Sequence, residues 1–359
     1  MKRWQRWFAA AAGVVILAAA AGCGGAATQT GGKIKLLETG STLLYPLFNI
    51  WVPAYQKLHP QVQITTAGTG SGEGIADAIA GTVQIGASDA YMSGPQVTQN
   101  PGLLNIPLAI SAQQINYNLP GLNATHLKLS GPVLAGIYLG KIRHWDNPAI
   151  KGLNPGVKLP HHVIIPVHRA DGSGDTFIFT QYLSFSDPAW QHQVGYGTTV
   201  GWPSVPGGVA MEGNPGMVQA LESSPYTIAY VGISWLDRTD AAHLGYAALE
   251  NRADNFVLPT RASIEAAAAG KVSQTPADER ISLVYAPGKD SYPIINYEYA
   301  IVNRKQPDPR TAQALTAFLK WAVSSRGGST AAFLDRVHFL SLPASVVKLS
   351  LAQIDQIGK

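Results

Sequence analysis

Cysteine is nearly absent from this sequence, because Cys23 is the only one among 359 residues. A single thiol excludes an internal disulfide and any zinc or redox site that needs two or more cysteines. Charged residues are also scarce, at 13% of the chain. Lys and Arg form no run that would mark a nucleic-acid-binding surface. We therefore expect no nucleic-acid partner and no cysteine-based cofactor.

The common catalytic motifs are missing as well. The sequence has neither a GxxxxGK[ST] loop, which argues against nucleoside-triphosphate chemistry, nor an HExxH motif. The stretch GASDA (86–90) is close to GxSxG but ends in alanine, so it does not support a nucleophile elbow. His161, His162 and His168 do not form a metal-binding pattern, because adjacent strand residues point in different directions. We expect no metal, no cofactor and no enzyme activity.

The N-terminus carries an apolar run with a basic start. Lys2, Arg3 and Arg6 precede an apolar segment at 8–21, an order that is typical of a signal peptide over 1–22. The segment is too short to span a membrane comfortably. Removal of 1–22 takes away three positive charges, so the formal net charge of +4 becomes +1.

The position of Cys23 predicts a lipid anchor. It follows two alanines and a glycine at 20–22, which is similar to a bacterial lipobox, whose cysteine is lipidated and becomes the mature N-terminus. A plain secreted protein with a chance cysteine is the alternative. The small residues of 23–32 predict a flexible tether. Lipidation would hold the protein at the extracytoplasmic face of the cell membrane.

Beyond the tether, the sequence predicts short strands that alternate with helices. Strand-like runs at 33–38 and 62–68 are followed by glycine-containing junctions and then by helical spacing at 43–59 and 74–83, and a third strand-like run lies at 84–90, with the strand ending at Asp89. This alternation favours an α/β fold with parallel strands.

Two long apolar segments at 106–119 and 292–303 have strand character without a following helix. We interpret them as paired crossovers between two discontinuous domains. The predicted organisation has lobe 1 at 33–110 plus 300–359, lobe 2 at 119–291, and hinge crossovers at 111–118 and 292–299. An amphipathic helix at 310–324 would complete lobe 1.

Three junctions between a predicted strand and a predicted helix share one pattern: Gly40-Ser41-Thr42, Gly70-Ser71-Gly72 and Gly172-Ser173-Gly174. The first helical turn has N–H groups without intrahelical partners, and the helix dipole favours an anion there. Ser and Thr are also common helix caps, which is the alternative for any single junction. The third junction adds Arg169, whose guanidinium suits an oxyanion, although Arg169 could instead pair with Asp171.

At these residues the sequence resembles the phosphate-binding proteins of bacterial ABC phosphate transporters. The similarity covers nearly all of the mature chain and rests on several motifs in the same order: GSTLLYPLF (40–48), GTGSGEG (68–74), GASDAYMS (86–93), IYLGKIRHWDNPAI (137–150), LNPGVKLP (153–160) and RADGSGDTFIFT (169–180). The resemblance implies a two-lobed, type II periplasmic-binding-protein-like fold that closes at a hinge. It also implies a monomer that delivers inorganic phosphate to a permease with a cytoplasmic ATPase.

The resemblance also implies a set of site residues. Phosphate-binding positions carried over by position are Ser41, Thr42, Leu43, Ser71, Asp89, Arg169, Ser173, Gly174 and Asp175, with Asp171 as a supporting residue. Asp89 matches the carboxylate that accepts a hydrogen bond from the ligand's own proton. Asp175 departs from the family pattern, since many members have threonine after Ser-Gly.

Asp89 provides a physical basis for selectivity. Phosphate at neutral pH carries a proton that a buried carboxylate can accept, whereas sulfate carries none and is repelled. A repelled or unsatisfied buried charge costs on the order of a few kcal/mol, which is ~100-fold or more in affinity. Asp175 would add a second proton test and suit the monobasic form. Its alternative is an exposed residue in the first helical turn that favours the helix dipole.

Three other functions stay open from the residues alone. The same architecture could bind another oxyanion such as sulfate or molybdate. A secreted phosphatase or esterase could use Ser41, Ser71 or Ser173, although no base or metal supports it. A secondary role as a surface adhesin is the third.

Overall fold

The computed structural model describes residues 32–359. The predicted signal peptide (1–22), the lipidation site Cys23 and all of the tether (23–32) except its last residue lie outside the described residues. None of the helices over 32–359 combines the length and the apolar character needed to cross a membrane. The folded unit described below comprises residues 33–359.

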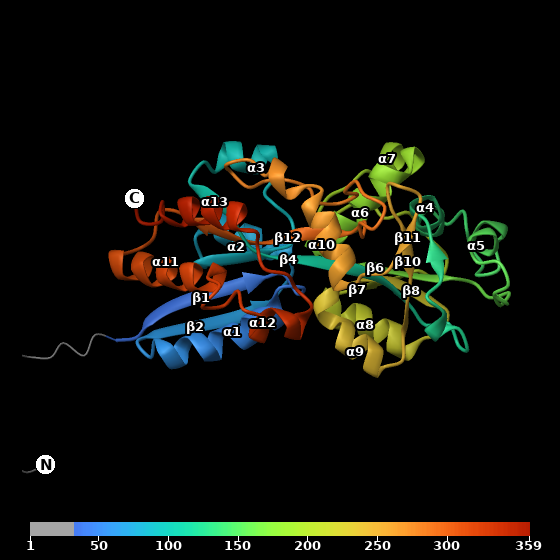
Figure 1. Ribbon diagram of the computed structural model, residues 1–359, viewed down its shortest axis with the longest axis horizontal. Helices are drawn as coiled ribbons and strands as arrows, with labels where there is room; N and C mark the ends of the chain where they lie inside the picture. The colour runs from blue at the N-terminus through green and yellow to red at the C-terminus, as the bar shows by residue number, and fades with distance from the viewer. Residues whose placement is uncertain (1–31) are drawn as a thin grey trace, which may run out of the picture. The chain divides into compact units, whose positions relative to one another are not determined.

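The described residues form one large mixed sheet and one small sheet (Figure 1). The neighbours in the large sheet, in spatial order, are β2 (Val62–Gly68), β1 (Ile34–Gly40), β3 (Ile85–Ser88), β12 (Ile295–Asn303), β4 (Leu103–Tyr117), β8 (Thr227–Gly232), β6 (Ile165–Arg169) and β7 (Val209–Met211), with β9 (Gly245–Tyr246) paired to β4. The small sheet contains β11 (Phe256–Val257), β10 (Ala248–Glu250) and β5 (Lys128–Leu129).

Each end of the large sheet is a parallel α/β unit, as the alternating pattern predicts. Strand β1 is parallel to β2 and β3 at one end, and β6 is parallel to β7 and β8 at the other. Between them, β12 and β4 pair with each other antiparallel. We call the elements around β1 lobe 1 and those around β6 lobe 2.

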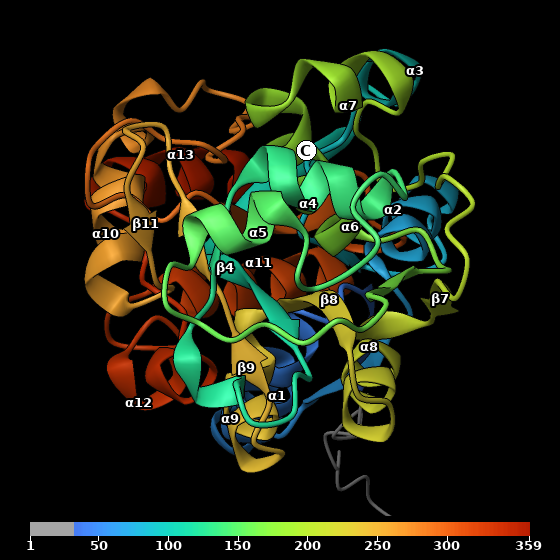
Figure 2. The same ribbon diagram turned by 90° about the vertical axis from the view of Figure 1, so that its right-hand side faces the viewer.

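Helices cover both lobes (Figure 1). Lobe 1 carries α1 (Tyr45–Leu58), α2 (Ser71–Ala80), α3 (Gly94–Gln99), α11 (Pro309–Val323), α12 (Ala331–Leu334) and α13 (Ala344–Ile354). Lobe 2 carries α4 (Gly131–Tyr138), α5 (Pro148–Leu153), α6 (Gly174–Ser186), α7 (Pro188–Gln193), α8 (Gly213–Ser223), α9 (Leu236–Ala241) and α10 (Arg261–Ala269). Figure 2 shows α4 and α6 above strand β8 and α8 below it.

Helix α11 shows how an N-cap residue and the spacing of apolar residues define a helix in this sequence. Its N-cap Asp308 accepts hydrogen bonds from the N–H groups of Arg310 and Thr311, which satisfies two donors of the first turn. Its buried residues recur every three or four positions, and among them Leu315 and Phe318 have no exposed surface. The predicted amphipathic helix at 310–324 is therefore confirmed with a shift of one residue at each end.

Helix α1 begins later than the helical spacing at 43–59 predicts. The Ser41 hydroxyl accepts hydrogen bonds from the N–H groups of Leu43 and Leu44, at 3.1 and 2.9 Å, and holds these residues in a turn. The helix then runs from Tyr45 to Leu58. The turn leaves Ser41, Thr42 and Leu43 between β1 and the helix, where they are free to face lobe 2.

Both long segments at 106–119 and 292–303 contain long strands, β4 and β12, as predicted. Strand β4 pairs with β12 up to Ala112, and from Gln113 onward it pairs with β8 of lobe 2. This change of partner lies inside the predicted crossover at 111–118. That 111–118 and 292–299 form the hinge stays a prediction.

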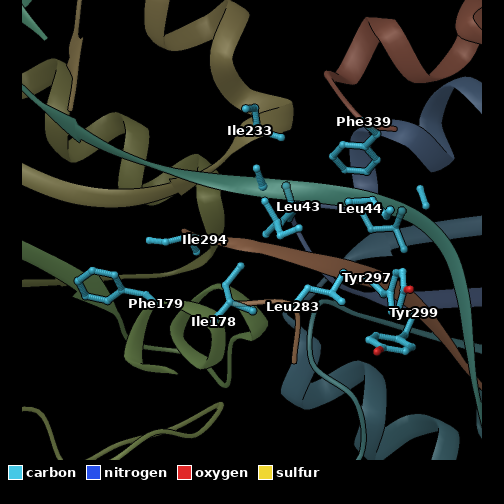
Figure 3. Packing of buried hydrophobic residues seen from close by; sticks show 14 of the residues in the cluster. Leu43, Leu44, Ile178, Phe179, Ile233, Leu283, Ile294, Tyr297, Tyr299 and Phe339 are labelled. Atoms are coloured by element: carbon cyan, nitrogen blue, oxygen red, sulfur yellow. The ribbon is translucent and has the colours of Figure 1, made fainter. Parts of the chain in front are cut away.

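The apolar core continues across this crossover region (Figure 3). Ile294 and Tyr297 come from the second crossover segment, whereas Ile178 and Phe179 belong to α6 of lobe 2. Leu43 packs against Gly232 of β8, so a residue of the first glycine-serine junction already contacts lobe 2.

Candidate functional site

The three glycine-serine junctions converge at the contact between the lobes. Ser41 and Ser71 of lobe 1 both donate hydrogen bonds to the carboxylate of Asp89, which follows β3. From lobe 2, Gly174 lies so close that a Cβ there would stand 2.5 Å from Asp89 Oδ2 and 2.6 Å from Ser71 Oγ. Glycine is therefore required at 174 for lobe 2 to approach the Asp89 carboxylate.

The backbones of the two lobes meet directly at Gly72 and Gly172. The Gly72 N–H donates to the Gly172 carbonyl at 2.8 Å. A Cβ at Gly72 would stand 2.9 Å from the Gly172 Cα, so any side chain would push the lobes apart. The glycines of these junctions therefore allow the two lobes to touch, in addition to their place at the starts of helices.

Thr42 and Asn214 form a second bridge between the lobes. The Thr42 hydroxyl accepts hydrogen bonds from the backbone and side-chain N–H groups of Asn214, both at 3.0 Å. The Trp235 indole donates to the Thr42 carbonyl at 2.9 Å, and the Ser234 hydroxyl donates to the Leu43 carbonyl at 2.7 Å. The first junction is therefore held to lobe 2 through Thr42 and Leu43.

Arg169, at the end of β6, is almost fully buried and carries the positive charge of the cluster. Its Nε donates to Asp171 Oδ1 at 2.7 Å, its Nη2 donates to Asp171 Oδ2, and its Nη1 donates to Asp175 Oδ2 at 3.0 Å. Asp171 also accepts from the Gly213 N–H at 3.1 Å. The predicted pairing with Asp171 is present, and it fixes the orientation of the guanidinium.

Asp175 is buried, so the alternative of an exposed first-turn residue is wrong. Its Oδ1 accepts from Gln113 Nε2 at 3.0 Å, and its Oδ2 accepts from Asn214 Nδ2 at 2.6 Å in addition to Arg169. It stands at the second position of α6, whose first N–H groups have no intrahelical acceptor. Ser173 caps this helix by accepting from the Thr176 N–H at 3.2 Å.

Burial raises the pKa of two of the three carboxyl groups in the cluster, those of Asp89 and Asp175. It raises the pKa of Asp175 to about 7, with the negative charge of Asp89 adding to it and Arg169 opposing it. Burial also raises the pKa of Asp89, against hydrogen bonds from Glu298, Ser41 and Ser71 and the charge of Arg169. For Asp171, the hydrogen bond and charge of Arg169 outweigh burial and hold its pKa below the usual value.

The predicted phosphate-binding residues thus lie together in one buried cluster, with the half-buried Asp171 at its edge. The hydrogen-bond partners of the three junction serines, among the residues that the structure describes, are Asp89 and backbone N–H groups and include no histidine or lysine. In the same part of the chain, no group of three or more His, Cys, Asp or Glu side chains could hold a metal ion.

Three contributors were missed by the sequence reasoning. Asn214 follows Gly213, the first residue of α8, so it marks a fourth strand-glycine-helix junction that lacks the serine of the others. Gln113 and Glu298 lie in the two long strands, where polar residues within an otherwise apolar segment were the available signal. Both side chains are fully buried.

Comparison with known proteins gives a consistent result. Residues 25–326 match the family model described as "PBP superfamily domain". A phosphate-binding protein PstS of Methanocaldococcus jannaschii is 36% identical over 362 residues, which cover 94% of this chain and 91% of the relative. The PstS of Pasteurella multocida is 35% identical over 314 residues, covering 88% of each chain.

Among solved structures, a high-affinity periplasmic phosphate-binding protein (PfluDING) bound with phosphate superposes with a TM-score of 0.71 at 21% identity. The match covers 89% of this chain and 93% of the other. It shares the two-lobed α/β fold. The chain therefore belongs to the PBP superfamily and, within it, to the family of PstS phosphate-binding proteins.

Proposed function

We propose that this protein binds inorganic phosphate between its two lobes and delivers it to an ABC permease for import. The observation that supports this most directly is the meeting of Arg169, Thr42, Ser71 and Asp89 in one buried cluster to which both lobes contribute. A guanidinium, hydroxyls and first-turn N–H groups suit a tetrahedral oxyanion. The relatives at 35–36% identity are themselves named as phosphate-binding proteins.

In this proposal, each lobe supplies part of the ligand shell. Ser41, Thr42, the Leu43 N–H and Ser71 would bind from lobe 1, and Arg169, Ser173, Gly174 and Asp175 would bind from lobe 2. Because these side chains are buried when the lobes touch, phosphate can enter only when they separate. Opening at the crossovers 111–118 and 292–299 would admit the ligand, and closure would form the surface that the permease recognises.

Asp89 would select protonated phosphate over sulfate. Its carboxylate already receives hydrogen bonds from Ser41 and Ser71, which favour the ionised form. An ionised, buried Asp89 accepts from a P–OH group and repels a sulfate oxygen. This argument ranks phosphate above sulfate and molybdate as the ligand.

Asp175 would add a second proton-sensitive contact. With its pKa raised to about 7 by burial and by the charge of Asp89, it is neutral below that pH and charged above it. The neutral form donates to a phosphate oxygen and reduces the negative charge around the ligand. We therefore expect Asp175 to favour binding at lower pH.

We further propose that the protein is a monomer without catalytic activity, anchored by a lipid on Cys23 at the extracytoplasmic face of the membrane. Within 32–359, the hydroxyls of Ser41, Ser71 and Ser173 contact no histidine or lysine that could activate them, which supports a binding role over a phosphatase or esterase. The permease and its cytoplasmic ATPase would be its transport partners.

Calorimetric titration of the purified protein with phosphate tests the proposal. We expect one saturable site per chain, no saturable heat with sulfate at neutral pH, and no turnover of a chromogenic phosphate ester. Equal affinity for both anions would refute the Asp89 argument. Ester turnover that disappears when Ser41, Ser71 or Ser173 is replaced by alanine would support the alternative function as a phosphatase or esterase.

A further inference from the structure

Glu298 is a buried carboxyl group that the proposed ligand shell does not use. It lies in the crossover strand β12 with no exposed surface and forms no ion pair with any described Lys or Arg. Figure 3 shows its neighbours Tyr297 and Tyr299 on the same side of β12, so Glu298 faces the opposite side of the strand. A buried glutamate without a cation calls for an explanation.

Only one of the two carboxyl oxygens of Glu298 accepts hydrogen bonds from the described residues. Oε1 accepts from Asn296 Nδ2 at 3.0 Å and contacts the Ser111 hydroxyl, whereas Oε2 is buried without a donor among the described residues. Ser111 also lies 2.7 Å from Asn296 Oδ1, to which its single hydrogen can be donated instead. If Glu298 were ionised, its Oε2 would carry negative charge in a buried position without a hydrogen-bond donor.

The neighbour of Glu298 is Asp89. Strand register places the two residues next to each other, because β12 pairs antiparallel with β3 and sets Tyr299 opposite Ser88. Asn296 contacts both, since its Nδ2 donates to Glu298 Oε1 at 3.0 Å and to the backbone carbonyl of Asp89 at 3.1 Å. Two neighbouring buried carboxyl groups are not both ionised, so they share one proton.

The surroundings decide which carboxyl group holds that proton. Asp89 receives hydrogen bonds from Ser41 and Ser71 and feels the charge of Arg169, all of which favour its ionised form. Burial raises the pKa of Glu298 well above its usual value, and the negative charge of Asp89 raises it further. The proton therefore belongs on Glu298, and on Oε2, because Oε1 already accepts from Asn296.

We propose that Glu298 is a specificity-determining positioning residue, which as a neutral acid donates its Oε2 hydrogen to Asp89 and keeps Asp89 an acceptor. This inference rests on the proposed function, in which Asp89 accepts the ligand's proton. Without that donor, Asp89 would itself take up the proton. A protonated Asp89 can donate to a sulfate oxygen, so the discrimination against sulfate would be lost.

Two substitutions at Glu298 separate this role from packing. Glu298→Gln keeps the shape and a permanent N–H donor toward Asp89, and Glu298→Leu keeps bulk but removes the donor. Glu279 offers a matched control, because it is equally buried, accepts from Ser350 Oγ at 2.8 Å and Gln353 Nε2 at 2.5 Å, and has no carboxyl partner. Glu279→Gln and Glu279→Leu therefore measure the cost of disturbing a buried glutamate elsewhere.

The measurement is the ratio of phosphate to sulfate affinity at neutral pH, by calorimetry or by competition against radiolabelled phosphate. We expect Glu298→Gln to stay within about threefold of the wild-type ratio, and Glu298→Leu to lower it at least ~10-fold, which corresponds to about 1.4 kcal/mol. Both Glu279 variants should keep the wild-type ratio. Thermal unfolding reports the stability of each variant.

Two results would overturn the inference. A Glu298→Gln protein that loses discrimination as far as Glu298→Leu would mean that the ionised form is needed, and a folded Glu298→Leu protein with the wild-type ratio would leave Glu298 a core residue. If Glu298→Leu does not fold, Glu298→Gln alone decides. A wild-type protein that binds no phosphate would instead overturn the proposed function.

Discussion

The two halves of the site are chemically different. Among the described residues, lobe 1 brings hydroxyls and one carboxylate, through Ser41, Thr42, Ser71 and Asp89, but no cation. Lobe 2 brings the guanidinium of Arg169, held by two carboxylates of its own lobe. In the proposed function, lobe 2 therefore attracts the anion, and Asp89 of lobe 1 selects for its proton. We expect the lobes to close only around a ligand that meets both requirements.

Loss of the cation should have the largest effect. Arg169→Leu removes the charge and takes the ion-pair partner away from Asp171 and from the buried Asp175, and breaking a buried ion pair costs about 3–5 kcal/mol. We expect phosphate affinity to fall at least ~100-fold, with reduced thermal stability.

A second variant separates charge from geometry at this position. Arg169→Lys keeps the charge but cannot contact Asp171 with two parallel hydrogen bonds, so it should recover part of the affinity at most. A Leu variant that binds phosphate as the wild type does would show that lobe 2 does not supply the attraction. Calorimetry and thermal unfolding of both proteins give the answer.

Loss of the Asp89 carboxylate should reduce the selectivity for phosphate over sulfate. Asp89→Asn offers an amide that can donate to sulfate, so the phosphate-to-sulfate affinity ratio should fall by ~100-fold. The half-buried Asp77 lies outside the site and accepts a hydrogen bond from Thr82, so Asp77→Asn serves as the control. An Asp89→Asn protein with the wild-type phosphate-to-sulfate affinity ratio would show that Asp89 of lobe 1 does not select the ligand.

The contact between the lobes can be disturbed without touching the ligand shell. Gly72→Ala places a Cβ against the Gly172 backbone, so closure should be impeded and phosphate affinity should fall about 10-fold, with little change in thermal stability. Gly94→Ala, where a Cβ has open space, is the matched control. Small-angle scattering with and without phosphate reports closure, and full closure in Gly72→Ala would contradict the argument.

The smallest effect is expected from Asp175, and it is a pH effect. Since the pKa of Asp175 is raised to about 7, binding that favours its neutral form weakens as pH rises through that value, by up to one factor of ten per pH unit above it. Phosphate itself titrates in this range, so the comparison with Asp175→Asn isolates the side chain. The Asn variant should show a shallower decline, and parallel profiles would exclude a protonated Asp175.

Some residues of the site could be predicted from the sequence, and others could not. The junction serines and Arg169 were predictable because strand-glycine-helix starts and a nearby cation have local signatures. The burial of Asp175 was not, since aspartate in a first helical turn usually faces solvent, and here Gln113 and Asn214 from other elements enclose it. The pairing of Asp89 with Glu298 depends on strand register, which joins residues more than 200 positions apart.

A crystal structure of the protein with bound phosphate tests the central claim most directly. The account predicts phosphate enclosed between the lobes, with Arg169 and Thr42 on its oxygens, Ser71 donating to it, and Asp89 within hydrogen-bonding distance of one protonated oxygen. Phosphate bound elsewhere, or bound in contact with only one lobe, would contradict it.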